Sequence, residues 1–346
     1  MIKKKLNEIS RLLNGYAFKS SKYVQSGLRV IRIANVQDGY LSDSEPCFYP
    51  IETTTELEQF LLKPHDLLMS LTGNVGRVAF IEKEYLPAGL NQRVECIRPF
   101  EEADKEYLYY FFRSPMFQRE SLKASHGSAQ LNLSTVWLAN FYVVYPDEEK
   151  RKTVVNTLRT IDNLIREKRN QLIKLDCLVK SRFMEMFMQG QCDIYPLKKW
   201  SEVATIKHGK DYKKSITKKG GYPVFGSGGF MGVFANGFIT KKNSTLIGRK
   251  GTLDKPIFVK ENVWNVDTAF GVEPDEDIVN STFFFHRSCL YDYKSLSTST
   301  TLPSMTKSTL ESLSIGIPPM ELQKNFASFV ELIDKSRFVC HSRNFL

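Results

Sequence analysis

The sequence lacks most of the patterns that announce a metal site or an enzyme. Its six cysteines are scattered and form no C-x-x-C motif, so we expect reduced thiols rather than a disulfide framework or a zinc site. The five histidines have neither the i, i+4 spacing nor the acidic neighbours of metal ligands. There is no G-x-x-x-x-G-K-[ST] loop, which makes ATP hydrolysis by this chain unexpected. An Asn/Asp-Pro-Pro-aromatic tetrad, typical of amino-methyltransferases, is also missing. The sequence therefore indicates no catalytic centre, metal or cofactor of its own.

Long hydrophobic runs are missing as well. The longest apolar stretches, such as 107–112 and 141–145, are far shorter than a membrane span. The first residues show no hydrophobic signal region, and we expect a cytoplasmic protein without a membrane partner. With 346 residues, 42% of them hydrophobic, the chain can form about two domains. Its net charge of +10 favours an anionic partner.

The chain contains an internal repeat. Residues 8–19 resemble residues 202–213 at an offset of 194, and the Gly73-x-x-Gly76 motif resembles Gly248-x-x-Gly251 at an offset of 175. A third set of matches, at an offset of 172, pairs Leu138, Val143, Pro146, Glu149, Ile161 and Asp162 with Leu310, Ile315, Pro318, Glu321, Ile333 and Asp334. The matches are collinear, which indicates two copies of one domain.

Each copy begins with a strand-rich domain. Short β-like runs alternate with turns rich in Gly, Asn, Asp and Ser; these runs are 28–33, 78–81, 141–145, 245–247 and 257–259. The glycine-rich stretch Gly226–Gly232 lacks the G-x-G-x-x-G spacing and a strand–helix setting, so we interpret it as a turn or loop rather than a dinucleotide site.

A long helix is predicted after the first domain. No Gly or Pro occurs from Asp147 to Gln189. Apolar residues follow a 4-3 spacing, at Val154, Leu158, Ile161, Ile165, Leu172, Leu175, Val179 and Met186. This pattern predicts a coiled-coil-like helix of about 65 Å with a partner along its length. The periodic part of the second copy, at Phe326, Phe329, Val330 and Ile333, ends near Phe338, and we expect a shorter second helix.

One pattern imitates a nuclease. Pro274-Asp275 followed by Asp292-Tyr-Lys294 resembles the P-D…D-x-K arrangement of metal-dependent nucleases, whereas the first copy has Pro99-Phe100 at the matching place. A nuclease that uses Asp275, Asp292 and Lys294 therefore stays as an alternative. A further alternative is a coiled-coil scaffold without catalytic activity, which binds only proteins.

The remaining signals favour nucleic-acid binding. Lysines are concentrated between residues 198 and 219, and basic residues lie around both glycine motifs, Arg77 in the first copy and Arg249-Lys250 in the second. Glycine lets a backbone approach a ligand closely, and Arg can neutralise phosphate or bind guanine with two hydrogen bonds. Amide and hydroxyl side chains recur in the matching loops 130–132 and 300–304. The predicted DNA contacts are Arg77, Gln130, Asn132, Arg249 and Lys250, with Lys213 and Lys214 on phosphate.

The whole layout resembles one family, the specificity (S) subunits of type I restriction–modification systems. The motifs that carry the resemblance are 13–19 (LNGYAFK), 71–76 (LTGNVG), 91–94 (NQRV), 107–112 (YLYYFF), 130–133 (QLNL) and the helix start with Pro146, Ile161, Asp162, Lys168, Gln171 and Leu172. These motifs extend over the first copy, and the internal repeat extends the resemblance to nearly the whole chain.

The resemblance implies an α+β fold with two strand-rich target-recognition domains, separated by long, conserved coiled-coil helices that pack antiparallel. The domains would be residues 1–146 and 193–318, and the spacer helices 147–192 and 319–346. Each domain would read one half of a split duplex DNA site, with the helices setting the spacing. The subunit would have no catalysis of its own. It would dock methyltransferase subunits, expected to be two, which bind S-adenosylmethionine and methylate adenine N6, and restriction–translocase subunits.

Overall fold

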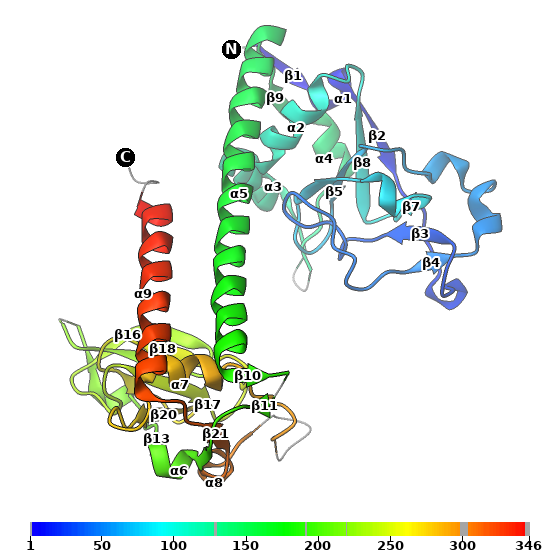
Figure 1. Ribbon diagram of the computed structural model, residues 1–346. Coiled ribbons are helices and arrows are strands. Elements are labelled where there is room, and N and C mark those ends of the chain that lie inside the picture. Colours follow the sequence, from blue (N-terminus) through cyan, green and yellow to red (C-terminus); the bar gives the residue numbers. More distant parts are fainter. Residues whose placement is uncertain (1, 128–129, 191, 219, 298–303, 343–346) are drawn as a thin grey trace. The chain divides into compact units, whose positions relative to one another are not determined.

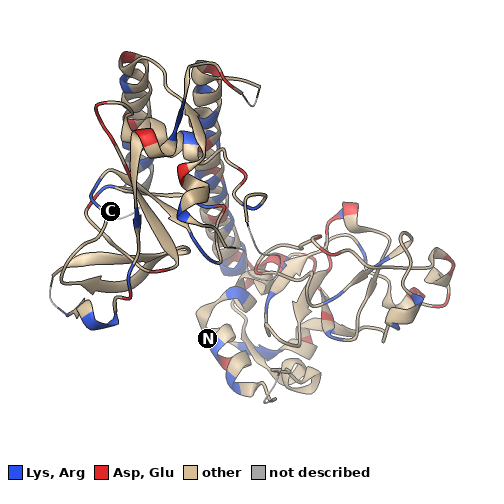
Figure 2. Ribbon diagram, turned by 90° about the horizontal axis from the view of Figure 1, so that it is seen from below, with Lys and Arg blue, Asp and Glu red and all other residues tan. Residues whose placement is uncertain are grey.

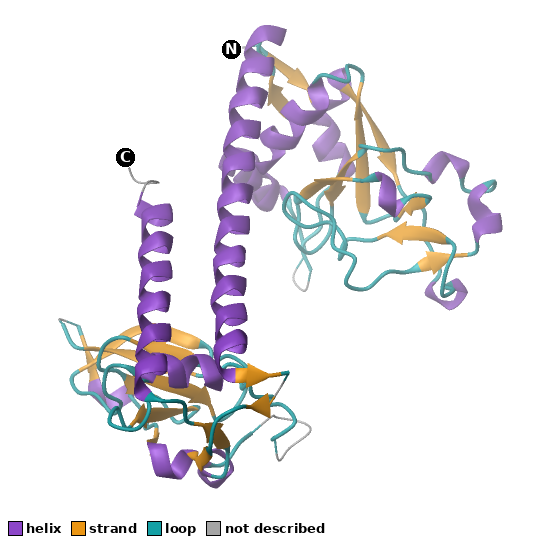
Figure 3. Ribbon diagram, viewed as in Figure 1, coloured by secondary structure: helices purple, strands orange, loops and turns teal. Residues whose placement is uncertain are grey.

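The chain folds as two compact units, Met1–Ile165 and Arg166–Leu346, and the division falls inside its longest helix. The computed structural model describes residues 2–127, 130–190, 192–218, 220–297 and 304–342. Strands and short helices alternate in both units (Figures 1 and 3). Within the described residues, no helix is both long and apolar enough to cross a membrane.

The first unit is built on a four-stranded antiparallel sheet in the order β2-β8-β5-β6 and a three-stranded sheet in the order β4-β3-β7. Its elements are β1 (Lys3–Lys5), α1 (Leu6–Ile9), β2 (Ser10–Asn14), β3 (Leu28–Ile31), β4 (Phe48–Tyr49), β5 (Leu67–Ser70), β6 (Val78–Phe80), β7 (Ala88–Leu90), β8 (Val94–Pro99), α2 (Asp104–Arg113), α3 (Pro115–Ala124), α4 (Thr135–Asn140) and β9 (Tyr142–Val144). Strand β1 pairs with β9, which ties the start of the domain to its end.

The second unit repeats the main sheet of the first and differs in its second sheet. Its main sheet has the order β13-β20-β17-β18, and β12 pairs with β21 as β1 does with β9. Its second sheet has four strands, in the order β14-β16-β15-β19, where the first unit has three. Its elements are β10 (Met188–Gln189), β11 (Cys192–Asp193), β12 (Leu197–Lys199), α6 (Trp200–Val203), β13 (Ala204–His208), β14 (Ile216–Thr217), β15 (Tyr222–Gly226), β16 (Gly229–Ala235), β17 (Ser244–Gly248), β18 (Ile257–Val259), β19 (Trp264–Asn265), β20 (Ala269–Pro274), α7 (Ser281–Ser288), α8 (Lys307–Glu311), β21 (Ser314–Gly316) and α9 (Met320–Ser342). The internal repeat is thus a repeat of structure as well as of sequence.

Helix α5 (Glu148–Phe187) is continuous, as the absence of Gly and Pro predicts. Its first turns pack on the first unit through Val155, and its last turns are buried in the second unit through Phe183 and Phe187. Both basic and acidic residues occur along its length (Figure 2).

Helix α9 packs antiparallel against the last turns of α5, beside it in Figure 1. The Phe326 ring lies 5.3 Å from the Phe183 ring, and further along α9 Arg337 forms an ion pair with Asp176. The predicted partner along the whole seam is absent from the described residues, since Val154, Ile161 and Ile165 are more than 40% exposed. Helix α9 also continues to Ser342, beyond the end that its apolar period predicts.

In both long helices, a buried polar side chain near the start forms a hydrogen bond with the loop that precedes the helix. Arg151 donates from Nη1 to the Pro146 carbonyl at 2.7 Å, and Gln323 donates from Nε2 to the Pro318 carbonyl at 2.8 Å. These residues correspond at the offset of 172. We call this arrangement the helix lock.

The chemistry of the helix lock differs between the two copies. Arg151 lies with Nε 2.8 Å from the buried Asp104 carboxylate and with its guanidinium 4.0 Å above the Tyr145 ring. Gln323 is neutral and completes its contacts with the backbone, accepting a hydrogen bond from the Asn280 N–H at 2.7 Å. The first lock therefore depends on a buried charge pair, and the second on neutral hydrogen bonds.

Candidate nucleic-acid interface

In the first unit, two loops that the sequence singles out lie side by side. We call residues 71–77, between β5 and β6, the first glycine loop. Its Thr72 donates from Oγ1 to Asn132 Oδ1 at 2.8 Å, and the Gly73 N–H donates to the Leu131 carbonyl at 2.8 Å. The loop before α4 is thereby attached to the glycine loop, although nearly 60 residues separate them in the sequence.

The predicted contact residues of the first unit occupy this junction. Gln130 and Asn132 are exposed, and a Cβ atom at Gly73 would lie 3.2 Å from Gln130 Nε2. Glycine at this position thus leaves room for the amide. Arg77, at the far end of the loop, is partly buried and donates from Nη1 to Gln37 Oε1 at 2.6 Å. Gln37 was not among the predicted contacts, because it lies in a loop without a motif.

The second unit repeats the junction with other side chains. The second glycine loop is residues 249–255, between β17 and β18. Lys250 forms a β-bridge with Ser304, and the Met305 N–H donates to the Arg249 carbonyl at 2.9 Å. Of the predicted matching loop 300–304, residues 300–303 lie outside the described residues. Its described end meets the glycine loop as Asn132 does in the first unit.

Strand register corrects the alignment of the two glycine motifs. Leu67 lies opposite Ile97 in the first sheet, and Thr245 lies opposite Val272, the counterpart of Ile97, in the second. Residues of β5 and β17 therefore correspond at an offset of 178, which places Gly251 and not Gly248 at the position of Gly73. Their φ angles agree, 79° and 75°.

With this register, the basic residues of the two glycine loops do not occupy corresponding positions. Arg249 and Lys250 stand where the first unit has Leu71 and Thr72, so they are not counterparts of Arg77. A G-x-x-G pattern is too short to fix an alignment, whereas a hydrogen-bonded ladder fixes it to the residue.

Lys213 lines a hollow of about 640 Å³ in the second unit. The hollow is also lined by Asp267, Thr268 and the hairpin 226–231. Arg249 does not line it but is attached to its lining, because its backbone N–H donates to the Thr268 carbonyl at 2.7 Å. Lys214 is exposed in the same 3₁₀ turn as Lys213. The structure thus brings four of the predicted residues, Lys213, Lys214, Arg249 and Lys250, to neighbouring loops of one unit.

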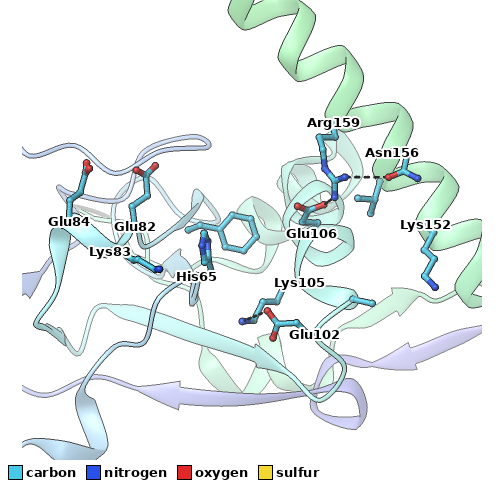
Figure 4. Close-up of a pocket in the computed structure, with 13 residues that line it drawn as sticks. His65, Glu82, Lys83, Glu84, Glu102, Lys105, Glu106, Lys152, Asn156 and Arg159 are labelled. Carbon is cyan, nitrogen blue, oxygen red and sulfur yellow. Dashed lines mark hydrogen bonds and ion pairs between the residues drawn. The ribbon is translucent and has the colours of Figure 1, made fainter.

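A larger hollow, of about 910 Å³, lies beside the start of α5 in the first unit (Figure 4). Two ion pairs lie at its wall: Lys105 Nζ lies 2.8 Å from Glu102 Oε1, and Arg159 pairs with Glu106. The second unit has a corresponding hollow of about 870 Å³, in which Phe258 and Lys324 replace Phe80 and Lys152. Neither hollow is lined by a predicted contact residue.

The nuclease pattern does not assemble into a site. Asp275 accepts a hydrogen bond from the Asp277 N–H at 3.1 Å, and Asp292 accepts one from the Lys294 N–H at 3.2 Å, so both carboxylates cap their own turns. The Lys294 ammonium pairs instead with Asp254, at 2.7 Å. Within the described residues, no group of three His, Cys, Asp or Glu side chains is placed to hold a metal ion.

Comparison with known proteins gives a consistent result. The family model described as "Type I restriction modification DNA specificity domain" matches residues 1–175 and 196–339. The MjaVIII specificity subunit of Methanocaldococcus jannaschii is 29% identical over 192 residues, which are 54% of this chain and 45% of that relative. The EcoAI specificity subunit of Escherichia coli is 26% identical over 155 residues, 43% of this chain and 26% of that relative. The aligned segments thus span less than half of these two relatives.

Other comparisons extend over nearly the whole chain. A putative MjaX specificity subunit of M. jannaschii is 23% identical over an alignment that includes 93% of this chain and 83% of that relative. The crystal structure of a type I S subunit from M. genitalium superposes with a TM-score of 0.60 at 15% identity, and 99% of this chain and 91% of that chain are covered. A structure from a study of type I R-M complex assembly superposes with a TM-score of 0.53 at 15% identity, with 98% and 91% covered. The α+β fold with two repeated domains is confirmed.

Proposed function

We propose a DNA-reading function for this chain, which belongs to the type I restriction modification DNA specificity domain family. In this proposal the chain recognises a bipartite duplex DNA site and docks two methyltransferase subunits and the restriction–translocase subunits, without catalysing a reaction itself. S-adenosylmethionine would bind to the methyltransferase partners. Because the substrate is chromosomal and invading DNA, we infer a cytoplasmic location.

One observation carries the proposal: the two units hold different polar side chains on the same framework. The junction between the glycine loop and the loop before the short helix is formed by Thr72 and Asn132 in the first unit, and by Lys250 and Ser304 in the second. Sequence is read by side chains at base edges, whereas the framework that positions them carries no sequence information. A constant framework with variable side chains is what two domains that read different half-sites require.

The proposed domains follow the sequence analysis, with residues 1–146 and 193–318 as recognition domains and the helices 147–192 and 319–346 as spacers. We assign base or phosphate contacts to Arg77, Gln130 and Asn132 in the first domain. In the second domain, Arg249 and Lys250 would contact bases or phosphates, and Lys213 and Lys214 would contact phosphates. The support is that Gln130, Asn132 and Lys250 are exposed at the two junctions. Arg77 and Arg249 are partly buried in the glycine loops, and Lys213 and Lys214 are exposed in a turn of the second domain.

Arg249→Ala tests base reading. We expect it to weaken binding of the methylated sequence by about 1–3 kcal/mol and to relax one position in one half-site. The measurement is a genome-wide map of adenine methylation in cells that express the chain with its methyltransferase partner. Gln130→Ala is the matched change in the first domain and should relax a position in the other half. Methylation without sequence preference, or changes in both halves from either variant, would refute the assignment.

Lys213→Ala tests the phosphate contact. A lysine that binds phosphate adds to affinity without reading sequence, so its loss should reduce affinity for all sequences alike. The slope of log affinity against log salt concentration should become shallower by about one. Lys335→Ala, an exposed lysine on α9, serves as the control and should leave the slope unchanged. An unchanged slope in Lys213→Ala would remove this residue from the interface.

A further inference from the structure

The β15–β16 hairpin of the second domain exposes large apolar side chains at its tip. Phe230 is 50% exposed and Met231 43% exposed, just after the turn Gly226–Gly229 that joins the strands. The Phe230 ring lies 5.8 Å from that of Phe225 and 5.5 Å from that of Phe234. The neighbouring rings thus support Phe230 without covering it.

The pairing of the two strands turns Phe230 away from one buried cluster of its domain. Val233 and Ala235 pack with Val224 and Val266 in that cluster. Phe230 lies opposite Phe225, the residue after Val224 on β15, and successive side chains of a strand point to opposite faces, so Phe230 points away from the cluster around Val224. An exposed ring at this position contributes little to the packing of its own domain.

The hairpin adjoins the basic residues of the proposed interface. The Ser227 N–H donates to Thr268 Oγ1 at 3.3 Å, and the Thr268 carbonyl accepts from the Arg249 N–H. Phe230 and Lys213 line the same hollow, together with Asp211 and Asp267. Lys214 follows Lys213 in the same turn, so the exposed ring lies beside residues that the proposal assigns to DNA contacts.

Within its described residues, the first domain has no tight hairpin at this place. The parallel pairs Ile31–Leu90 and Phe225–Asn265 occupy matching places in the two domains. In the first domain β3 pairs with β4 across the long connection 32–47, which carries Gln37 to Arg77. A partner protein bound alike to both copies would need the same contact twice. A feature confined to one domain suits a half-site that this domain alone reads.

We propose that Phe230 is an apolar wedge that the second domain presses into the base stack of its half-site. The inference rests on the proposed DNA-reading function and adds a mode of recognition to it. Apolar side chains that enter a base step partly unstack it and bend the duplex. Pyrimidine–purine steps such as TA and CA unstack most easily. Phe230 would thus select a flexible step in the half-site without a hydrogen bond to any base.

The test uses the full complex of this chain with its methyltransferase partner and duplexes that carry the sequence found by methylation mapping. Phe230→Ala should weaken binding by about 5- to 150-fold, as expected for loss of one ring–base contact. The salt dependence should stay unchanged, because no charge is removed. Phe230→Leu, which keeps an apolar wedge, should retain most of the affinity. Phe238→Ala is the matched control, since Phe238 is 42% exposed but stacks on Tyr222 away from the hollow.

A second measurement locates the unstacked step. A 2-aminopurine placed in the second half-site should brighten on binding of the wild-type complex and not of Phe230→Ala. Replacing the flexible step by a stiff one should weaken the wild type but leave Phe230→Ala unaffected. If the wild type binds specifically while Phe230→Ala binds equally well, the wedge is excluded and the DNA-reading function stands. Loss of methyltransferase binding without DNA in Phe230→Ala would also overturn the wedge, in favour of a protein contact. A wild-type complex without sequence preference would overturn the proposed function itself.

Discussion

Replacing Arg151 by alanine is expected to lower the free energy of unfolding of the first domain by about 3–5 kcal/mol. Arg151 is 6% exposed and its partner Asp104 is 1% exposed. Removing the guanidinium leaves the Asp104 carboxylate buried, with the Tyr145 hydroxyl as its remaining polar contact. A buried charge that loses its counter-ion carries a desolvation cost that no other group offsets.

Hydrogen exchange of the full chain measures this effect, because it follows each unit separately. Amide protection in α2 and β9 should fall in Arg151→Ala, while the second unit stays protected. Arg159→Ala is the control, since Arg159 also pairs with an acid of α2 but its side chain is 51% exposed, and it should cost less than about 1 kcal/mol. The double change Arg151→Gln with Asp104→Asn should be less damaging than Arg151→Gln alone. Equal effects of Arg151→Ala and Arg159→Ala would contradict this account of the helix lock.

Glu95 should make the first domain less stable as the pH rises through 7. The Glu95 side chain is fully buried in β8, both its oxygens lack a hydrogen-bond partner, and burial raises the pKa of the carboxyl from 4.5 to about 7. Between pH 4.5 and 7 the folded state therefore keeps a proton on Glu95 that the unfolded state has already released. The neutral carboxyl contributes fully to stability below pH 4.5, and this contribution is lost as the pH rises to 7 and above. The difference is about 3 kcal/mol.

Glu95→Gln removes this titration. Relative to the wild type, the variant should be stabilised more at pH 8 than at pH 5. The measurement is urea unfolding of the full chain at a series of pH values, with protection of β5 and β8 as the local readout. Glu58→Gln, at an exposed position, should leave the pH profile unchanged. The corresponding residue of the second domain is the buried Phe270, so an apolar side chain fits this place in the fold. A Glu95→Gln profile parallel to that of the wild type would show that the carboxyl is already paired or hydrated.

Much of the architecture could be predicted from the sequence because it depends on local patterns. The absence of Gly and Pro over 147–189 predicted α5 to within two residues at its C-terminal end. The glycine-rich stretch 226–232, interpreted as a turn or loop, contains the tight turn of the β15–β16 hairpin. The repeat followed from collinear matches, which short-range patterns suffice to reveal.

The parts that could not be predicted depend on contacts between distant residues. Nothing near Arg151 in the sequence indicates that its partner is Asp104, 47 positions earlier. The true register of the glycine loops required the strand ladders, since three residues of difference leave a G-x-x-G pattern intact. Phe230 was unremarkable as one of 24 phenylalanines, until its pairing with Phe225 and its exposure showed where it lies in the hairpin.

The helix lock also decides where recognition modules can be recombined between chains. A junction cut at Pro146 would leave Arg151 on the recipient helix and replace Asp104 with whatever residue the donor module carries. A donor without an acid at that place would leave the Arg151 guanidinium buried without a counter-ion. Hybrids whose junction lies one turn later, after Arg151, take Arg151 and Asp104 from the same chain. We expect a far larger proportion of these hybrids to fold than of hybrids joined at Pro146.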